Sequence, residues 1–291
     1  MSQSERFIRT LLAMFVLCAS TVTALAQDPV RLALGDDATT QTVRRLLGVP
    51  EGKELRVRTG REVPLIRYQV SFESFDGLTI NADYAHASEN PNAPTLILLP
   101  NMRSSRRDFA QLEDFLLQRG YSYLAFDLRG YGGSRFMNDG TAIDTDAMEN
   151  DIEGTEFRKM ARDVEAAIDW LYARHLVRSG GIFLVGDRVG GTAAAMGLVE
   201  NATDVRGAVI FNPVRSFRSI NADELLGKIQ GRPVLLVAAS VDRAATTSIR
   251  FIQSANSAAR AEILHDIDPR VPLSDSRRAQ EVILEFIESL H

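Results

Sequence analysis

The residues best suited to chemistry in this sequence lie within Gly181–Gly191, which reads GIFLVGDRVGG. Ile182–Val185 is a short apolar run typical of a buried strand, and Thr192–Val199 is a small-residue segment that predicts a helix. Glycines bracket the sharp turn between the two. A strand, a tight glycine turn and a helix are the context of the nucleophile elbow G-x-S-x-G, whose third residue attacks a carbonyl carbon.

Arg188 stands at that third position. A guanidinium stays protonated and cannot attack a carbonyl, so the pattern predicts the elbow without its nucleophile. At the N-terminal end of a helix, where free amides favour an anion, Arg188 could clamp a carboxylate or phosphate. The alternative is an internal ion pair with Asp187, Asp242 or Asp268.

The elements that must position this turn alternate between strand and helix patterns along the chain. Strands are expected at 65–73, 78–85, 95–99, 121–126, 182–185, 205–211, 233–239 and 261–267, and helices at 108–118, 157–176, 192–199, 221–229, 244–257 and 274–290. Asp76-Gly77 between the first two strands predicts a hairpin. The expected fold is α/β: a mostly parallel sheet covered by helices on both faces, with an antiparallel N-terminal hairpin.

The N-terminal segment has the pattern of a signal peptide. Arg6 and Arg9 precede the apolar stretch Leu11–Ala19, and Ala24-Leu25-Ala26 is a small-x-small cleavage site. We therefore expect a signal peptide at 1–26, an N-terminal extension at 27–65 and the main domain at 66–291. The apolar stretch is too short for a stable membrane anchor, so we expect a periplasmic or secreted protein.

Composition narrows the function further. The net charge is −5, with 33 basic and 38 acidic residues, so no basic surplus suggests nucleic-acid binding. The single cysteine, Cys18, lies in the expected signal peptide, which leaves the mature chain without a disulfide or a thiol nucleophile. No pattern indicates a cofactor, and the oligomeric state is not readable from the sequence.

Four landmarks in order make residues 68–290 resemble the α/β-hydrolase family, in its dienelactone-hydrolase and small-esterase branch. The elbow is one landmark, and Phe126–Ser134 (FDLRGYGGS) is another, where the resemblance implies that Asp127 and Arg129 are scaffold residues. Pro233–Arg243 places Asp242 at the position of the family's catalytic acid.

The remaining landmark is Leu98–Phe109, where the family has a His-Gly loop whose amides help to form the oxyanion hole. Pro100 and Asn101 stand there instead. The resemblance implies that Met102 or Arg103 supplies one amide of the hole and Val189 the other, because a backbone donor does not depend on the side chain. The alternative is an ordinary loop that is capped by a serine.

The catalytic histidine of the family also has no counterpart at the expected place. After the last expected strand the chain reads ILHDIDPRVPL, which puts Asp268 or Pro269 where the histidine belongs. His265 comes about three residues early, as a displaced base or as an ordinary strand-end histidine. With both the serine and the histidine replaced, the sequence favours a catalytically impaired pseudo-hydrolase. Its former active site would bind a small ligand, such as a carboxylate or an ester, or a partner.

Other functions remain open at this point. A working ester or lactone hydrolase would need a relocated nucleophile, such as Ser104, Ser105 or Ser240, or a water held by Asp242 or Asp268. A purely structural or partner-binding role is also open. The acidic segment 138–156 could hold a metal, but it lacks the EF-hand pattern, and a weakly structured, mobile lid near the pocket mouth is the favoured interpretation.

Overall fold

The structure is a computed structural model that describes residues 57–60, 63–87, 94–177, 180–229, 231–268 and 271–290. The expected signal peptide and most of the expected extension lie outside the described residues, so both stay predictions. Of that extension, the structure describes β1 (Val57–Gly60), which pairs antiparallel with β2 (Val63–Glu73). This part of the extension therefore belongs to the sheet of the main domain.

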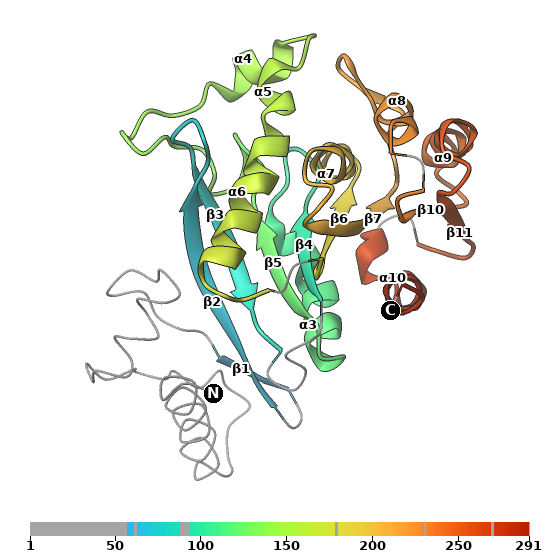
Figure 1. Cartoon of the computed structure of the whole chain (residues 1–291), viewed down its shortest axis with the longest axis horizontal. Coiled ribbons are helices and arrows are strands. Elements are labelled where there is room, and N and C mark those ends of the chain that lie inside the picture. Colours follow the sequence, from blue (N-terminus) through green and yellow to red (C-terminus); the bar gives the residue numbers. More distant parts are fainter. Residues whose placement is uncertain are drawn as a thin grey trace.

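Nine strands of the described residues form one mixed sheet in the order β1-β2-β3-β5-β4-β6-β7-β10-β11 (Figure 1). The strands not yet given are β3 (Thr79–Ala85), β4 (Thr95–Leu99), β5 (Ser122–Phe126), β6 (Ile182–Asp187), β7 (Val205–Phe211), β10 (Val234–Ala239) and β11 (Arg260–Leu264). Strands β1 to β3 are antiparallel, β3 joins β5 antiparallel, and all later pairs are parallel. The predicted fold class is thus confirmed.

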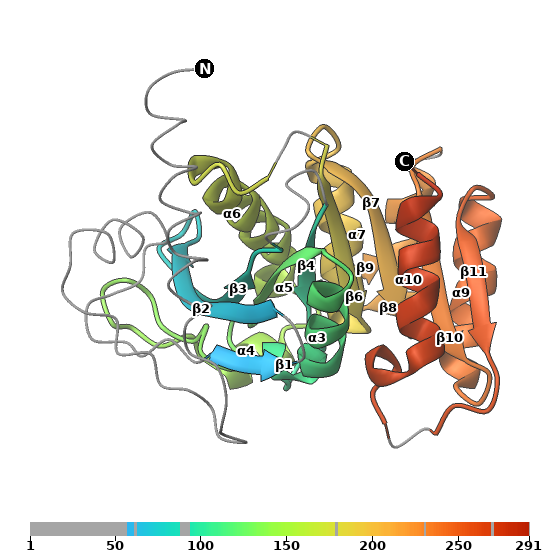
Figure 2. The same ribbon diagram turned by 90° about the horizontal axis from the view of Figure 1, so that it is seen from below.

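Helices cover both faces of the parallel strands, which explains why β4, β5 and β10 are apolar and buried throughout. Figure 2 shows α3 and α10 on one face and α6, α7 and α9 on the other. The helices are α3 (Ala110–Gln118), α4 (Thr145–Asn150), α5 (Thr155–Arg158), α6 (Met160–Ala173), α7 (Val189–Glu200), α8 (Ala222–Gly227), α9 (Arg243–Ala255) and α10 (Arg277–Glu288). A short ladder, β8 (Ser216–Phe217) with β9 (Ile220–Asn221), precedes α8.

The helix expected over 157–176 is interrupted. Residue Lys159 separates α5 from α6. Glu156 and Asp163 both bind the guanidinium of Arg129. Lys159 itself keeps right-handed helical dihedral angles, φ −66° and ψ −16°, so the interruption is confined to this residue.

The acidic segment 138–156 is more ordered than the sequence suggested, because its carboxylates cap short helices. Asp144 Oδ1 accepts a hydrogen bond from the Ala147 amide at 2.9 Å and caps α4. Asp151 Oδ2 accepts one from the Thr155 amide at 2.6 Å, at the start of α5. The expectation of a weakly structured segment was therefore wrong: aspartate is a strong N-cap residue, and the helices are too short to show a periodic pattern.

Candidate active site

The turn between β6 and α7 has the backbone of a nucleophile elbow. Arg188 has φ 49° and ψ −105°, a conformation that costs a residue other than glycine about 1–3 kcal/mol. Its amide donates to the Phe211 carbonyl at 3.0 Å, and its carbonyl accepts from the Thr192 amide at 3.1 Å. A Cβ at Gly190 would collide with the carbonyl oxygen of Leu99. The strained turn predicted from the glycine spacing is therefore present, with arginine at its apex.

Arg188 forms an ion pair with Asp242, the residue for which the resemblance implies the position of the catalytic acid. Arg188 Nη2 donates to Asp242 Oδ2 at 2.8 Å, and the two side chains are 43% and 18% exposed. Asp242 follows β10 and caps α9, where its Oδ1 accepts a hydrogen bond from the Ala245 amide at 2.9 Å. Of the three internal partners that the sequence left open, the structure pairs Arg188 with Asp242.

The environment of Asp242 favours its ionised form. Partial burial works against ionisation, but the hydrogen bonds from the Ala245 amide and from Arg188 outweigh it. Together with the positive charge of Arg188, they hold the pKa of the Asp242 carboxyl below its usual range. Asp242 is thus an anion whose two oxygens are engaged by a helix N-terminus and a guanidinium.

Two of the amides that the resemblance implies for an oxyanion hole converge on one oxygen atom. The Met102 amide donates to Asn101 Oδ1 at 2.9 Å, and the Val189 amide donates to the same atom at 3.4 Å. Between Met102 and Arg103, which the sequence left open, the amide facing the Val189 amide is that of Met102. The hole is therefore occupied by a side-chain carbonyl oxygen of the chain itself.

Arg103 turns away from the hole. Its φ is 59°, and its guanidinium binds Glu149 in α4, with Nε at 3.1 and 2.9 Å from the two carboxylate oxygens. Tyr131 Oη donates to the same carboxylate at 2.9 Å, and Arg218 donates to the Glu149 carbonyl. Glu149 thus ties the segment 135–158, which we call the flap, to the loops around the elbow.

A cavity of about 280 Å³ lies between the flap and the loops that follow β4 and β5. The residues that line it are Arg103, Ser104, Gly130, Tyr131, Gly132, Arg135, Thr145 and Glu149. The flap therefore borders an open space beside the loop that supplies the Met102 amide.

Asp187 directly precedes Arg188 in the sequence, but its carboxylate binds a different side chain. Its Oδ1 accepts a hydrogen bond from Asn212 Nδ2 at 2.9 Å. Burial raises the pKa of Asp187 to about 6; Asn212 and the charge of Arg188 oppose the rise, while the charges of Asp108 and Asp242 add to it. Asn212 was not predicted as a partner of Asp187, because only the parallel pairing of β6 with β7 brings the two residues together.

The described histidines do not replace the missing base. His265 is exposed just after β11, which ends at Leu264 rather than near residue 267. His86 Nδ1 lies 3.1 Å from Ser122 Oγ and 3.3 Å from Tyr84 Oη, and His175 follows α6. Asp268 is exposed, and Pro269 lies outside the described residues. Within the described ranges, the side chain bound to Asp242 is Arg188 and not a histidine.

One of the alternative serines has a carboxylate beside it. Ser104 Oγ donates to Asp108 Oδ2, which lies in the 3-10 turn Arg106–Phe109 that follows Ser105. Ser240 is held at the end of β10 by its amide, which donates to the Leu264 carbonyl at 2.8 Å. A carboxylate is a much weaker base than an imidazole, so the Ser104–Asp108 pair lacks the proton acceptor of a triad.

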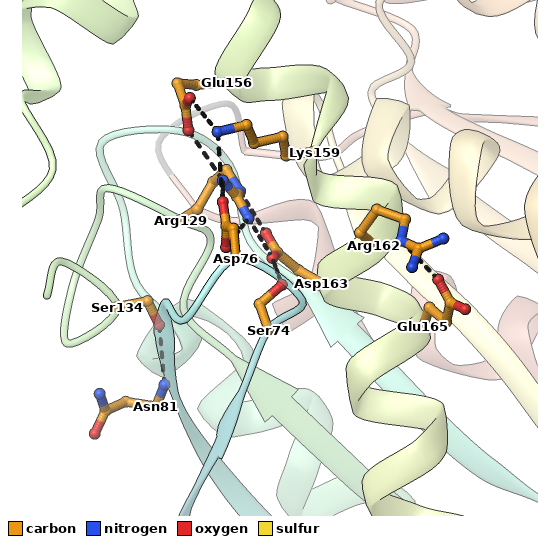
Figure 3. Close-up of polar contacts among 10 residues, drawn as sticks. All are labelled: Ser74, Asp76, Asn81, Arg129, Ser134, Glu156, Lys159, Arg162, Asp163 and Glu165. Atoms are coloured by element: carbon orange, nitrogen blue, oxygen red, sulfur yellow. Dashed lines mark hydrogen bonds and ion pairs between the residues drawn. The ribbon is translucent and has the colours of Figure 1, made fainter. Parts of the chain in front are cut away.

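The turn after β5 is held by buried polar contacts, in keeping with the scaffold role that the resemblance implied. Arg129 is fully buried and binds Asp163 at 2.7 Å, Glu156 at 3.0 Å and Asp76 at 3.1 Å (Figure 3). Asp163 Oδ1 also accepts a hydrogen bond from Ser74 Oγ at 2.6 Å. The cluster joins the β2–β3 hairpin to α5 and α6, beneath the flap.

Asp127 has a similar scaffold role on the other side of this turn. Its carboxylate accepts hydrogen bonds from the backbone amides of Arg106 and Gly133, each at 2.7 Å. It also forms an ion pair with the Arg106 side chain at 2.5 Å. Asp127 therefore joins the loop that follows β4 to the turn that follows β5.

Two negative findings apply to the described part of the chain. It contains no group of three or more His, Cys, Asp or Glu side chains arranged to hold a metal ion, and the acidic residues of the flap serve as caps and ion-pair partners instead. None of its helices is long and apolar enough to cross a membrane.

Residues 90–265, more than half of the chain, match the family described as serine aminopeptidase, S33. No curated protein matches the sequence.

Solved structures share the fold at low identity. Dienelactone hydrolase from Anabaena variabilis ATCC 29413 superposes with a TM-score of 0.59 at 16% identity, over 77% of this chain and 98% of that chain. The esterase Pf2001 from Pyrococcus furiosus gives 0.60 at 18% identity, over 80% and 96%. Est1E from Butyrivibrio proteoclasticus, with ferulic acid bound, gives 0.58 at 16% identity, over 75% and 99%. The resemblance to the dienelactone-hydrolase and esterase branch is thus confirmed at the level of fold.

Proposed function

The chain belongs to the serine aminopeptidase S33 family, and from that premise we propose that it is a non-hydrolytic member that binds a small carboxylate ligand in the former active-site pocket. The observation that carries this proposal is the Arg188–Asp242 ion pair at the apex of an otherwise complete elbow. A guanidinium in the nucleophile's place can bind an anion but cannot attack an ester or a peptide.

The electrostatics around Arg188 support binding over hydrolysis. Arg188 donates a hydrogen bond from Nη2 to Asp242, and its side chain is 43% exposed beside the first turn of α7. A guanidinium has five donors and matches a carboxylate in bidentate geometry, and a helix N-terminus favours the same charge. A family member without its triad keeps at most the rate acceleration of roughly 10³–10⁴ that comes from oxyanion donors and binding.

A hydrolysis assay tests the first half of the proposal. The full chain and an Arg188→Ala variant are compared with buffer on p-nitrophenyl acetate and on leucine p-nitroanilide, which probe ester and aminopeptidase activity. We expect all rates to match buffer. Turnover by the native chain that Arg188→Ala abolishes would overturn the proposal.

Thermal shift with ferulate and acetate tests the second half, with the uncharged methyl ferulate as a ligand control. We expect the carboxylates to raise the melting temperature of the native chain and methyl ferulate to leave it unchanged. Arg188→Ala should lose the shift. Arg215→Ala is the matched control, because Arg215 is 50% exposed and pairs with Asp223 at 2.9 Å; it should keep the shift, and its equal loss would contradict a role for Arg188.

One observation favours a second candidate, an active ester hydrolase with a relocated nucleophile. Ser104 lines the cavity and donates to Asp108. In this case the native chain hydrolyses p-nitrophenyl acetate, Arg188→Ala keeps the activity and Ser104→Ala loses it. The same three proteins therefore distinguish the two candidates.

We also propose that the protein is exported, on the strength of the signal-peptide pattern in residues 1–26. Expression in a bacterial host followed by N-terminal sequencing of the periplasmic fraction should give a chain that starts at Gln27. A cytoplasmic chain that retains Arg6 and Arg9 would contradict export.

A further inference from the structure

The side chain of Asn101 lies where a ligand's oxygen would lie. Its Oδ1 accepts hydrogen bonds from the Met102 amide at 2.9 Å and from the Val189 amide at 3.4 Å. These amides come from two segments far apart in the sequence, the loop after β4 and the first turn of α7. Two amide donors that converge on one point can bind one oxygen atom. In this structure that atom is Asn101 Oδ1.

The short side chain of asparagine explains why Asn101 can occupy the point where the two amides converge. Its side-chain carbonyl reaches the amide of the following residue, a short-range bond that asparagine forms readily. Glycine, which the family pattern has in this loop, has no side chain and would leave both amides open. Asparagine at position 101 therefore supplies an oxygen atom that occupies both amides.

We propose that the Asn101 carboxamide is an internal ligand of the oxyanion hole, and that a carboxylate ligand enters the pocket by displacing it. The displacement rests on the proposed function; the internal ligand does not. A charged oxygen forms stronger hydrogen bonds with amides than a neutral amide oxygen does, and Arg188, which directly precedes Val189, adds a cation beside the hole. A neutral carbonyl oxygen forms no stronger hydrogen bonds than Asn101 Oδ1 does and gains no comparable attraction from the charge of Arg188. The site therefore selects for carboxylates.

Backbone amide exchange, followed residue by residue by NMR, tests the internal ligand directly. In Asn101→Ala, the Met102 and Val189 amides should exchange at least tenfold faster. The Thr192 amide, which donates to the Arg188 carbonyl in the same helix turn, should keep its rate. Asn201→Ala, which removes an asparagine whose Nδ2 binds the Gly197 carbonyl at the other end of α7, should leave both amides unchanged. Equal acceleration at Thr192, or none at Val189, would overturn the proposal.

A thiol at the elbow offers an independent test. The full chain with Cys18→Ala and Arg188→Cys carries one thiol at the apex, and its acylation by p-nitrophenyl acetate depends on an available oxyanion hole. Alkylation by iodoacetamide passes through no oxyanion. Adding Asn101→Ala should speed acylation about 10- to 100-fold, up to the lower end of the roughly 10²–10³ that one oxyanion donor is worth, and should leave alkylation unchanged. A rise in both rates would show only better access, and no rise in acylation would show that Asn101 does not block the hole.

The experiments distinguish a failure of the internal-ligand proposal from a failure of the proposed carboxylate-binding function. If amide exchange and acylation respond as expected but no carboxylate shifts the melting temperature of either the native chain or Asn101→Ala, the internal ligand stands and the proposed function falls. If ferulate binds the native chain and Asn101→Ala with equal affinity, displacement of Asn101 is wrong. We expect Asn101→Ala to bind ferulate at least fivefold more tightly.

Discussion

Arg188 Nη2 lies 2.8 Å from Asp242 Oδ2, so the residue in the nucleophile's place is bound to the residue in the acid's place. In a working triad these two positions communicate through a histidine. Here the contact is direct. Serine at position 188 would remove this ion pair without supplying an imidazole, so we expect that it would not restore a relay.

Asp242 supports the fold mainly as a helix cap. Asp242→Ala should lower the free energy of unfolding by about 1–2 kcal/mol, because it removes the acceptor of the Ala245 amide at the start of α9. Asp242→Asn keeps that acceptor and loses only a partly exposed ion pair, so we expect a loss of about 1 kcal/mol or less. Urea unfolding at pH 7 measures both, and equal losses would show that the charge matters more than the cap.

The contribution of Asp242 should also depend on pH. Its pKa is lower in the folded than in the unfolded chain, so the stability it adds is fully present above the unfolded pKa of about 3.9 and is lost as the pH falls through the folded pKa. The difference between the native chain and Asp242→Ala should thus shrink below about pH 4. A difference that stays constant from pH 7 to pH 3 would contradict the assignment.

Asp187 should have the opposite pH dependence. Burial raises its pKa to about 6 in the folded chain, so folding takes up a proton between pH 4 and 6, and stability falls as the pH rises through that window. Asp187→Asn keeps an acceptor for Asn212 and removes this cost. We expect it to be more stable than the native chain by about 1–3 kcal/mol at pH 7.5, with the gain gone near pH 4. Urea unfolding at the two pH values checks this, and a gain of equal size at both would count against it.

Glu149 should hold the flap closed without contributing much to global stability. Glu149→Ala removes the bonds to Arg103 and Tyr131, and exposed pairs of this kind are worth about 1 kcal/mol or less. We expect faster amide exchange across 144–158. We expect the free energy of unfolding, measured with urea, to fall by no more than about 1 kcal/mol. Glu153→Ala lies in the same segment and is the matched control, since Glu153 takes part through its backbone amide. Similar exchange in the two variants would rule out a latch at Glu149.

The buried cluster around Arg129 should be among the most sensitive parts of the fold. Arg129→Met leaves the buried Asp163 without its cation (Figure 3), and breaking a buried pair in this way costs about 3–5 kcal/mol. Arg162→Met is the control, because the Arg162–Glu165 pair is 49% and 36% exposed and should cost about 1 kcal/mol or less. Comparable losses in urea unfolding would show that burial does not set the cost.

Much of the fold follows from local patterns in the sequence. Apolar runs such as Thr95–Leu99 and Val234–Ala239 are buried strands because both faces of a parallel sheet are covered. The glycines around Arg188 predict the elbow, since only residues without a Cβ fit where the turn meets the carbonyl of Leu99. The errors fall where helices are short or interrupted: the flap is ordered by caps in helices too short to be periodic, and the helix expected over 157–176 is interrupted at Lys159.

The sequence by itself determined that the elbow carries an arginine and that Asp242 follows the strand of Pro233–Arg243, and it left Met102 and Arg103 open as the loop amide that would face Val189. It could not decide between an Arg188 free to bind an anion and one paired internally, because Asp187, Asp242 and Asp268 were equivalent by spacing. The tertiary structure pairs Arg188 with Asp242, because β6 and β10 end at the same edge of the sheet. It also placed the Asn101 side chain between two amides from distant segments, a convergence that only the packing of α7 against the loop after β4 creates.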